Sequence, residues 1–276
     1  MFNKNKKYKM TKKIIIWNGA TLHRIKALKN FNNVKKGDIG GYVQYEHNLS
    51  QDGDCWLYEN SKAYNAASVN GNSRIYDNAE IYENAVINGE SLIRNDVKVC
   101  GFAHILDNAI ISNKCIICGG VIKGTSKLRD NVNVYGSVII DNSKLYDDCT
   151  ISGVGKITNC DIYDSANVRS YGHITDTLIC DNANIRTNID IHGGMFGGYA
   201  LIETANDWLL VRGTGSAHRA TNFFRVTSGE VMCKCGCFYG TLDEFKARVI
   251  DTHDDSKYAK EYLAVIELAK IYFNIL

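Results

Sequence analysis

The chain has 276 residues, 22% of them charged, and a formal net charge of +2 at pH 7. A chain of this length can bury a large core, and so small a net charge gives no whole-molecule reason to expect nucleic acid as a partner. No stretch approaches the roughly 18 apolar residues that cross a bilayer. The Lys-rich start has an apolar run only from Ile14 to Trp17, which is too short for a signal peptide. We therefore expect a cytoplasmic protein with neither a membrane nor a nucleic acid as its partner.

The first predicted element is a hairpin near the amino terminus. In KIIIWNGATLHRIKAL, two apolar runs flank Asn18-Gly19, a pair that favours a two-residue turn between antiparallel strands. We expect residues 14 to 28 to form this hairpin and to cover the open edge of the sheet that follows. Residues 1 to 36 are therefore interpreted as a basic tail and a hairpin cap.

A six-residue repeat dominates the middle of the chain. It is clearest in SRIYDNAEIYENAVINGESLI, residues 73 to 93, and a period of six excludes a helix. A small residue begins each hexad and an aliphatic residue follows two positions later, so both point to the same side of a strand, the inside. Turn-forming pairs such as Asp77-Asn78 and Glu83-Asn84 fill the remaining positions. Each hexad is thus a short strand and a corner, with these inward residues: Ser73, Ile75, Ala79, Ile81, Ala85, Ile87, Ser91 and Ile93.

Three such hexads close one triangular coil of a parallel β-helix, and IYDNAE resembles the hexapeptide repeat of left-handed β-helix proteins. The phase holds in sixes from Gly37 to Val121, and one residue is then lost after Val121, Val138 and Gly155. The last hexads begin at Leu178, Ala183 and Ile189. The predicted fold class is mainly β, a left-handed parallel β-helix of about nine coils over residues 37–194, between the hairpin cap and a small α+β domain at 195–276.

The outward positions predict an assembly. Tyr58 and Tyr76 should stack coil on coil, as should Tyr64 and Tyr82. Farther along, outward aliphatic residues would leave a lone rod with more contiguous apolar surface than a monomer usually shows. We therefore expect a homo-oligomer, with a parallel trimer favoured, as in proteins of similar fold. The aliphatic residues in question are Leu92, Leu106, Ile110, Ile116, Ile122 and Ile139.

Ten cysteines raise the question of disulfides or metal sites. Cys100 and Cys118 fall on outward positions one coil apart, near enough to pair in oxidising conditions, but without a secretion signal we expect free thiols. Five others fall on inward positions and are expected to be buried as small hydrophobic residues. These are Cys55, Cys115, Cys149 and Cys160 in the small position, and Cys180 in the aliphatic one.

The last part of the chain, from Met195, no longer follows the hexads. DWLLVRG, TNFFRVT and VMCKCGCF read as strands, the last two joined at Ser228-Gly229. Thr241 and Glu244 form a capping box that opens a helix ending near Ile250, and Asp255 or Ser256 caps a second helix. The second helix repeats apolar residues at helical spacing, and these are expected in the core rather than at a ligand: Tyr258, Tyr262, Ile266, Ala269 and Phe273.

Motifs at the two ends of the chain resemble those of one particular group of proteins. KKGDIGGYVQYEHNLSQDGDCWLYENSKAY and CGCFYGTLDEFKARV…THDDSKYAKEYLAVIELA are similar to a group of phage and prophage proteins with a hexapeptide-repeat middle, often labelled transferases or left without a function. The resemblance covers nearly the whole chain and implies an intracellular protein of an infected or lysogenic host cell. The transferase label rests on the fold, which does not establish chemistry.

One hypothesis is a hexapeptide-repeat acyltransferase. Such enzymes typically bind acyl-CoA in a groove between subunits of a trimer and use a histidine as general base. The outward histidines here are His104, His173 and His192, and the first two are the candidate catalytic residues. Each of them is equally consistent with a solvated residue on the face of the rod.

The hypothesis that we favour from the sequence is a non-enzymatic binding protein. VRGTGSAHRATNFFR places arginines around a glycine loop, where backbone N–H groups and guanidinium groups can hold a phosphate. A phage protein of this kind could sequester a nucleotide or a nucleotide-derived immune signal without a cofactor. The alternative is a tight hairpin with solvated arginines. The candidate ligand-binding residues are Arg212, Gly213, Gly215, Ser216, His218, Arg219, Arg225, Tyr239, His253 and Lys257.

Two further interpretations stay open. In one extended strand, Cys233 and Cys237 would lie roughly 13 Å apart, so they could not ligate one zinc ion together without a bend at Gly236. A zinc site could instead use Cys235, Cys237 and His253, as an alternative to thiols packed against the rod. The last interpretation is a purely structural rod.

Overall fold

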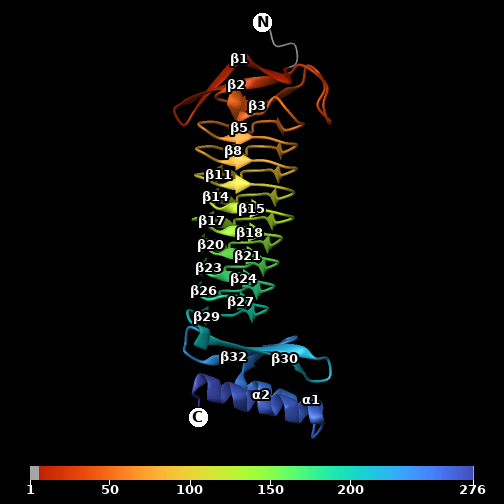
Figure 1. Cartoon of the computed structure of the whole chain (residues 1–276), viewed down its shortest axis with the longest axis vertical. Coiled ribbons are helices and arrows are strands. Elements are labelled where there is room, and N and C mark those ends of the chain that lie inside the picture. Colours follow the sequence, from red (N-terminus) through yellow and green to blue (C-terminus); the bar gives the residue numbers. More distant parts are fainter. Residues whose placement is uncertain (1–5, 276) are drawn as a thin grey trace.

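The computed structural model describes residues 6 to 275, so the first five residues of the predicted basic tail lie outside it. The chain forms a straight rod with an antiparallel hairpin at one end and a small α+β domain at the other (Figure 1). The predicted fold class is confirmed, because the rod is a left-handed parallel β-helix of about nine coils. Among the described residues, no helix is both long enough and apolar enough to cross a membrane.

Three parallel ladders run the length of the rod, and each coil contributes one short strand to each ladder. The largest sheet contains β1 (Tyr8–Trp17), β2 (Ala20–Ala27), β3 (Ile39–Val43), β5 (Lys62–Ala63), β8 (Glu80–Ile81), β11 (Lys98–Cys100), β14 (Ile116–Cys118), β17 (Asn133–Tyr135), β20 (Thr150–Gly153), β23 (Asn167–Ser170), β26 (Asn184–Thr187) and β29 (Leu201–Ile202).

The second sheet contains β4 (Trp56–Leu57), β7 (Arg74–Ile75), β10 (Leu92–Ile93), β13 (Ile110–Ile111), β16 (Lys127–Leu128), β19 (Lys144–Leu145), β22 (Asp161–Ile162), β25 (Leu178–Ile179) and β28 (Met195–Phe196). The third sheet contains β6 (Ser68–Val69), β9 (Val86–Ile87), β12 (His104–Ile105), β15 (Val121–Lys123), β18 (Ile139–Asp141), β21 (Lys156–Thr158), β24 (His173–Thr175) and β27 (Ile191–His192).

The predicted inward residues form the core of the rod. The small and aliphatic residues of the hexads between 73 and 93 have no exposed surface, as the six-residue period requires. At the corners, Asp77 and Glu83 have positive φ angles of 58° and 57°, which short polar residues tolerate better than β-branched ones. The predicted tyrosine stacks are also present, with ring centroids 4.1 Å apart for Tyr58 and Tyr76.

The amino-terminal cap is the predicted hairpin, although β1 begins at Tyr8 rather than at Ile14. Asn18 and Gly19 both have positive φ, 47° and 79°, as their two-residue turn requires. Strand β2 pairs antiparallel with β3, and β3 pairs parallel with β5. The hairpin therefore continues one sheet of the rod and covers its first coil.

Two hexads were predicted to begin one residue too late in the sequence, at Val121 and at Leu178. His104 pairs with Val121, a step of 17 residues, whereas Cys100 pairs with Cys118, a step of 18, so the residue is lost before Val121 and not after it. Ile122 consequently points inward and is fully buried, and its predicted outward position is wrong. The neighbouring Val121 is also apolar, so side-chain alternation alone did not fix the phase.

The same slip occurs near residue 178. Thr177 and Ile179 are the inward pair there, so Leu178 does not begin the hexad. Cys180 is half-buried and faces out, and its predicted place in an inward aliphatic position is wrong. The hexads also continue past Met195, because β28 and β29 pair in register with β25 and β26.

The predicted outward aliphatic residues do not form one patch. Ile110 lies on β13, Ile116 on β14 and Ile139 on β18, so they stand on three different faces of the rod. Each is half-buried because neighbouring coils cover part of it. The contiguous apolar surface on which the trimer expectation rested is therefore absent from these positions, and the trimer itself stays a prediction.

The carboxy-terminal domain is a four-stranded antiparallel sheet followed by two helices. Its elements are β30 (Trp208–Thr214), β31 (Arg219–Arg225), β32 (Val231–Cys235), β33 (Phe238–Thr241), α1 (Leu242–His253) and α2 (Lys257–Phe273). The predicted capping box of Thr241 and Glu244 is present, and Ser256 caps α2. The segment VMCKCGCF is two strands rather than one, because Gly236 turns the chain with a φ of 56°.

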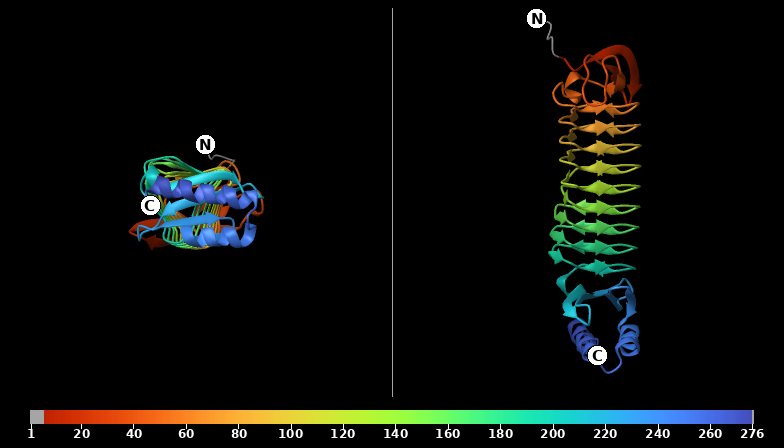
Figure 2. Two further views of the ribbon diagram at one scale, coloured as in Figure 1. Left: turned by 90° about the horizontal axis from the view of Figure 1, so that it is seen from below. Right: turned by 90° about the vertical axis from the view of Figure 1, so that its right-hand side faces the viewer.

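The sheet of this domain lies between the rod and the two helices (Figure 2). On the rod side, Phe224 packs against Phe196 of the last coil, and the Asn222 side-chain amide donates to the Met195 carbonyl oxygen at 2.6 Å. On the helix side, the predicted core residues of α2 are buried except Tyr258, which is half-buried. The domain is therefore packed onto the end of the rod rather than tethered to it.

Candidate functional site

A cavity of about 200 Å³ opens between the sheet and the helices of the carboxy-terminal domain. Strands β31 and β32 supply one wall, the turn before β33 supplies the rim, and α1 and α2 supply the opposite wall. Its lining residues are Arg219, Cys235, Cys237, Phe238, Phe245, Arg248, Val249, Thr252, His253 and Tyr262.

Local structure explains how the basic residues reach this cavity. Arg248 lies on α1 one turn after the buried Phe245, and its largely exposed side chain stands at the mouth of the cavity. Arg219 begins β31 and packs against Gly236, where any larger side chain would meet its guanidinium group. His253 ends α1 and stacks on Tyr262 of α2 with ring centroids 5.6 Å apart.

The cavity lining carries basic side chains. Two guanidinium groups and an imidazole line it, and its lining includes no carboxylate. The nearest ion pair of Arg248, with Asp251 at 3.4 Å, is well exposed and therefore contributes little. Burial raises the pKa of Tyr262 to about 12, so its hydroxyl stays protonated, and it donates to the Thr214 carbonyl oxygen at 3.5 Å. This set of donors suits a small anionic group.

The predicted glycine loop does not join this cavity as a phosphate cradle. Gly213 lies near the end of β30, Gly215 and Ser216 lie in the turn that leads to β31, and the Gly215 N–H donates to a Glu261 carboxylate oxygen at 2.9 Å. That carboxylate occupies the position where an anion would have to bind. The His218 ring lies 3.3 Å from the Gly213 carbonyl oxygen and closes the turn on itself.

Two of the predicted arginines have structural partners elsewhere. Arg212 reaches the His192 carbonyl oxygen of the rod at 3.5 Å. Arg225 donates to the Phe273 carbonyl oxygen at 2.9 Å and to the Gly229 carbonyl oxygen at 3.2 Å. Both guanidinium groups therefore hold parts of the fold together and point away from the cavity.

The remaining predicted ligand-binding residues divide between the cavity and the surface. Tyr239 lies in a shallower depression next to the cavity, and Lys257 lies 5.1 Å from the centre of the Tyr258 ring at the surface. Of the predicted residues, only Arg219 and His253 line the cavity. Arg248 was missed, because it is an exposed residue next to the apolar stripe of α1 and no local pattern marks it.

The predicted zinc ligands do not converge. Cys235 ends β32, Cys237 lies beyond the Gly236 turn, and their potential ligand atoms do not gather with that of His253 within 4.8 Å in the part of the chain described. A group that does gather is Asp164, Cys180 and Asp181 at a corner of the rod. There the carboxylates accept backbone N–H groups of the next coil, which is a structural role.

The three outward histidines differ in their surroundings. His104 lines a hollow of about 410 Å³ on the rod, together with Phe102. His173 is exposed on β24. His192 has its Nδ1 atom 2.8 Å from the Thr175 hydroxyl and 3.3 Å from an Asp176 carboxylate oxygen. A histidine held in this way by a carboxylate leaves Nε2 free to take a proton, the arrangement of a general base.

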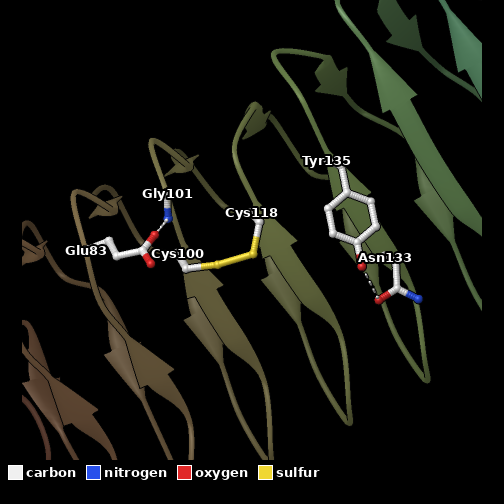
Figure 3. The surroundings of a disulfide bond; sticks show 6 residues. All are labelled: Glu83, Cys100, Gly101, Cys118, Asn133 and Tyr135. Atoms are coloured by element: carbon white, nitrogen blue, oxygen red, sulfur yellow. Dashed lines mark hydrogen bonds between the residues drawn. A yellow bond between two sulfur atoms is a disulfide. The ribbon is translucent and has the colours of Figure 1, made fainter. Parts of the chain in front are cut away.

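The predicted free thiols Cys100 and Cys118 are joined by a disulfide across adjacent coils, so that prediction is wrong (Figure 3). They are ladder neighbours at the ends of β11 and β14, with Cα atoms 4.7 Å apart, and parallel register brings their side chains together. Four of the inward cysteines, Cys55, Cys115, Cys149 and Cys160, are buried free thiols as predicted.

Comparison with known proteins gives one partial similarity. No protein-family model matches the chain. A segment of 51 residues is 39% identical to the uncharacterized acetyltransferase YdcK of Escherichia coli strain K12, and it makes up 18% of this chain and 16% of YdcK. The chain thus matches less than a fifth of the length of this relative. The chain is thus a β-solenoid of the hexapeptide-repeat type, and one segment of it is similar to part of this relative.

Proposed function

We propose that the carboxy-terminal domain binds a small anionic molecule in the cavity framed by Arg219, Arg248 and His253. The observation that carries this proposal is the gathering of three basic side chains around one hollow whose lining contains no carboxylate. Guanidinium groups on the wall of a cavity whose lining contains no carboxylate favour an anion that can accept paired hydrogen bonds from each of them.

The size of the cavity narrows the class of ligand. Its volume of about 200 Å³ is below the roughly 300 to 1,000 Å³ typical of sites that enclose a whole drug-sized molecule. One phosphate group fits inside, with the rest of the molecule outside against the rings at the rim. A nucleotide or a nucleotide-derived immune signal, the ligand suggested by the resemblance to phage proteins, meets this description, and binding without turnover would sequester it.

The test is titration calorimetry of the full chain with inorganic phosphate, AMP, ADP-ribose, cyclic nucleotides and acetyl-CoA. Arg219→Ala and Arg248→Ala are each expected to weaken binding about tenfold or more, because each removes a charge-assisted donor. Arg212→Ala is the matched control, since it removes an exposed arginine of the same hairpin that points to the rod. Absence of binding by every probe, or an equal loss in the control, would contradict the proposal.

Acyl transfer from acyl-CoA is a second candidate, supported by the YdcK segment and by the His192–Asp176 pair. In this reaction the thioester C–S bond breaks, the acyl carbon bonds to an acceptor oxygen or nitrogen, and the thiol of CoA leaves. Nε2 of His192 would take the proton of the acceptor and pass it to the leaving thiolate, while Asp176 would hold the ring. His104, beside its hollow, is the alternative base.

Release of free CoA thiol from acetyl-CoA, measured with a panel of amine and hydroxyl acceptors, tests this candidate. His192→Ala and Asp176→Asn should lower kcat about 100-fold or more if His192 is the base. His173→Ala is the control, because its ring is exposed on the same sheet. Loss of activity in His104→Ala alone would make His104, rather than His192, the general base. Absence of thiol release with every acceptor would contradict acyl transfer.

A further inference from the structure

At one corner of the rod, a glycine occupies the same position on four successive coils. Strands β11, β14, β17 and β20 lead into it in register, and each is followed or ended by a glycine of positive φ. A Cβ atom at Gly119 would collide with the carbonyl oxygen of Gly136, so the close stacking of coils excludes larger residues here. We call this surface the glycine corner, and its glycines are Gly101, Gly119, Gly136 and Gly153.

Large apolar side chains stand on the glycine corner on four of the five coils from β11 to β23, all but that of β14. Phe102 is 74% exposed, Val154 is 60% exposed and Tyr171 is 51% exposed, while Tyr135 is 41% exposed between them. Single exposed apolar residues are ordinary, but a row of four along one edge marks an interaction surface. The bare backbone between them allows another surface to approach closely.

The glycine corner also contains a hollow. It has a volume of about 410 Å³, begins beside Phe102 and has Gly119, Gly120 and Gly136 in its wall. Phe102 and Val121 are its apolar lining residues. Phe102 therefore projects on one coil and the hollow opens on the next, while Val154 projects on the far side of Tyr135.

These projections and the hollow are arranged symmetrically about the coil of Tyr135. Phe102 lies two coils before it and Tyr171 two coils after it, and the hollow at Gly119 lies one coil before it and Val154 one coil after it. We propose that the partner of this corner is a second copy of the chain, antiparallel, on a two-fold axis at Tyr135. Val154 of each copy then fills the hollow of the other, and each Phe102 meets a Tyr171.

The charges at the two ends of the corner fit the same arrangement. Glu83 lies three coils before Tyr135 and Arg186 three coils after it, and both are exposed. One carboxylate oxygen of Glu83 accepts the Gly101 N–H, which fixes its position (Figure 3). The antiparallel axis brings Glu83 of each copy to Arg186 of the other across a contact about 29 Å long. A parallel two-fold pair would instead oppose Glu83 to Glu83.

A charge exchange tests this interface by light scattering after size-exclusion chromatography. The wild-type chain is expected at twice its 30.8 kDa mass. Glu83→Arg or Arg186→Glu should weaken the dimer at least about tenfold, since each opposes like charges across the axis. The double exchange should restore the wild-type mass, which a merely structural role of either residue would not produce.

Glu59→Arg is the matched control, because Glu59 is also an exposed corner residue of positive φ whose carboxylate accepts an N–H of the next coil, that of Asp77. It should leave the mass unchanged, and Val154→Glu should give a folded monomer by circular dichroism. A wild-type monomer or trimer, a dimer indifferent to Glu83→Arg, or a failure of the double exchange to restore the dimer would overturn the proposal. None of these variants touches the anion cavity, so the two proposals fail separately.

Discussion

The rod and the carboxy-terminal domain use their polar side chains differently. At the corners of the rod, carboxylates and amides bond to the next coil, as Asp77 does with the Asn95 N–H at 2.8 Å and Asp181 with the Gly198 N–H at 2.7 Å. In the carboxy-terminal domain, Arg219 and Arg248 face a cavity whose lining offers them no carboxylate. A polar residue that recurs with the repeat is thus structural here, whereas the aperiodic part holds basic groups available to a ligand.

The two regions also differ in how a side chain comes to be buried. In the rod, burial follows from position in the hexad, and the residues in the inward aliphatic position from Ile75 to Ile202 have no more than about 1% exposed surface. In the carboxy-terminal domain, burial depends on contacts between distant segments, such as that of Phe245 with Phe223 at a centroid distance of 6.3 Å. The predictions below compare matched positions in these two settings.

The largest effect is expected from a charge in the core of the rod. Ile117→Asp should lower the free energy of unfolding by more than about 3 kcal/mol, because it buries a carboxylate without a partner. Ile116→Asp, one residue away, should cost under about 1 kcal/mol, because its side chain faces out beside Lys98. Urea unfolding followed by circular dichroism measures both. Equal losses would mean that position in the hexad does not determine burial.

A pair of glycines makes the next comparison. Gly153 of the rod has a φ of 112°, and a Cβ atom there would collide with the Ser170 carbonyl oxygen, so Gly153→Ala should cost about 2 to 4 kcal/mol. Gly213 has a φ of 83° with open space around it, so Gly213→Ala should cost only the backbone strain, about 1 to 2 kcal/mol. Thermal unfolding of the two variants checks the order. A larger loss at Gly213 would contradict this account of coil stacking.

Alkaline pH should weaken the rod through its buried thiols. Burial raises the pKa of Cys115 to about 12 from an ordinary value of 9.0. The folded state therefore keeps a proton that the unfolded chain loses, so this stability is complete below pH 9 and decreases as pH rises toward 12. The expected slope is about 1.4 kcal/mol per pH unit for each such thiol.

Unfolding free energies between pH 8 and pH 10.5 measure this effect. Cys115→Ala should show a shallower decline than the wild type, whatever its stability at pH 8. Cys237→Ala is the control, because Cys237 is exposed in the carboxy-terminal domain. An unchanged slope in Cys115→Ala would show that this thiol does not contribute.

The smallest effect is expected at the cap of α1. Thr241 accepts the Glu244 N–H on its hydroxyl at 3.2 Å, so Thr241→Ala should destabilise the carboxy-terminal domain by about 1 kcal/mol. Hydrogen exchange should quicken in α1 while the coils of the rod keep their protection. Thr227→Ala, at an exposed turn, is the control. Faster exchange throughout the rod would mean that the two regions unfold as one unit.

The repeat made most of the fold predictable from the sequence. A six-residue period states which residues point inward, and the hairpin and both helix caps have local signals at Asn18, Thr241 and Ser256. The phase slips came where two adjacent residues are both apolar, at Val121-Ile122 and Leu178-Ile179, since alternation is then ambiguous.

The candidate site was less predictable because its residues meet only through tertiary contacts. The Phe273 carbonyl oxygen that holds Arg225 is 48 residues away in the sequence, and the Glu261 carboxylate that caps Gly215 is 46 residues away. Arg219 was predicted from its neighbours in a motif and does line the cavity, but its companion Arg248 lies on a different element. Local spacing places Phe245 and Val249 on the inner face of α1 but gives no reason to single out the exposed Arg248.

The most direct test of the central claim follows the histidine side chains by NMR. The chain has 7 histidines, and among the described ones only His253 lines the cavity, so protein labelled with ¹⁵N at histidine carries its own controls. Titration with AMP, and separately with inorganic phosphate, is expected to shift the His253 imidazole resonances while those of His104, His173 and His192 stay in place. Resonances of His253 that do not move with either probe, or shifts confined to His104 or His192, would contradict an anion site in the carboxy-terminal domain.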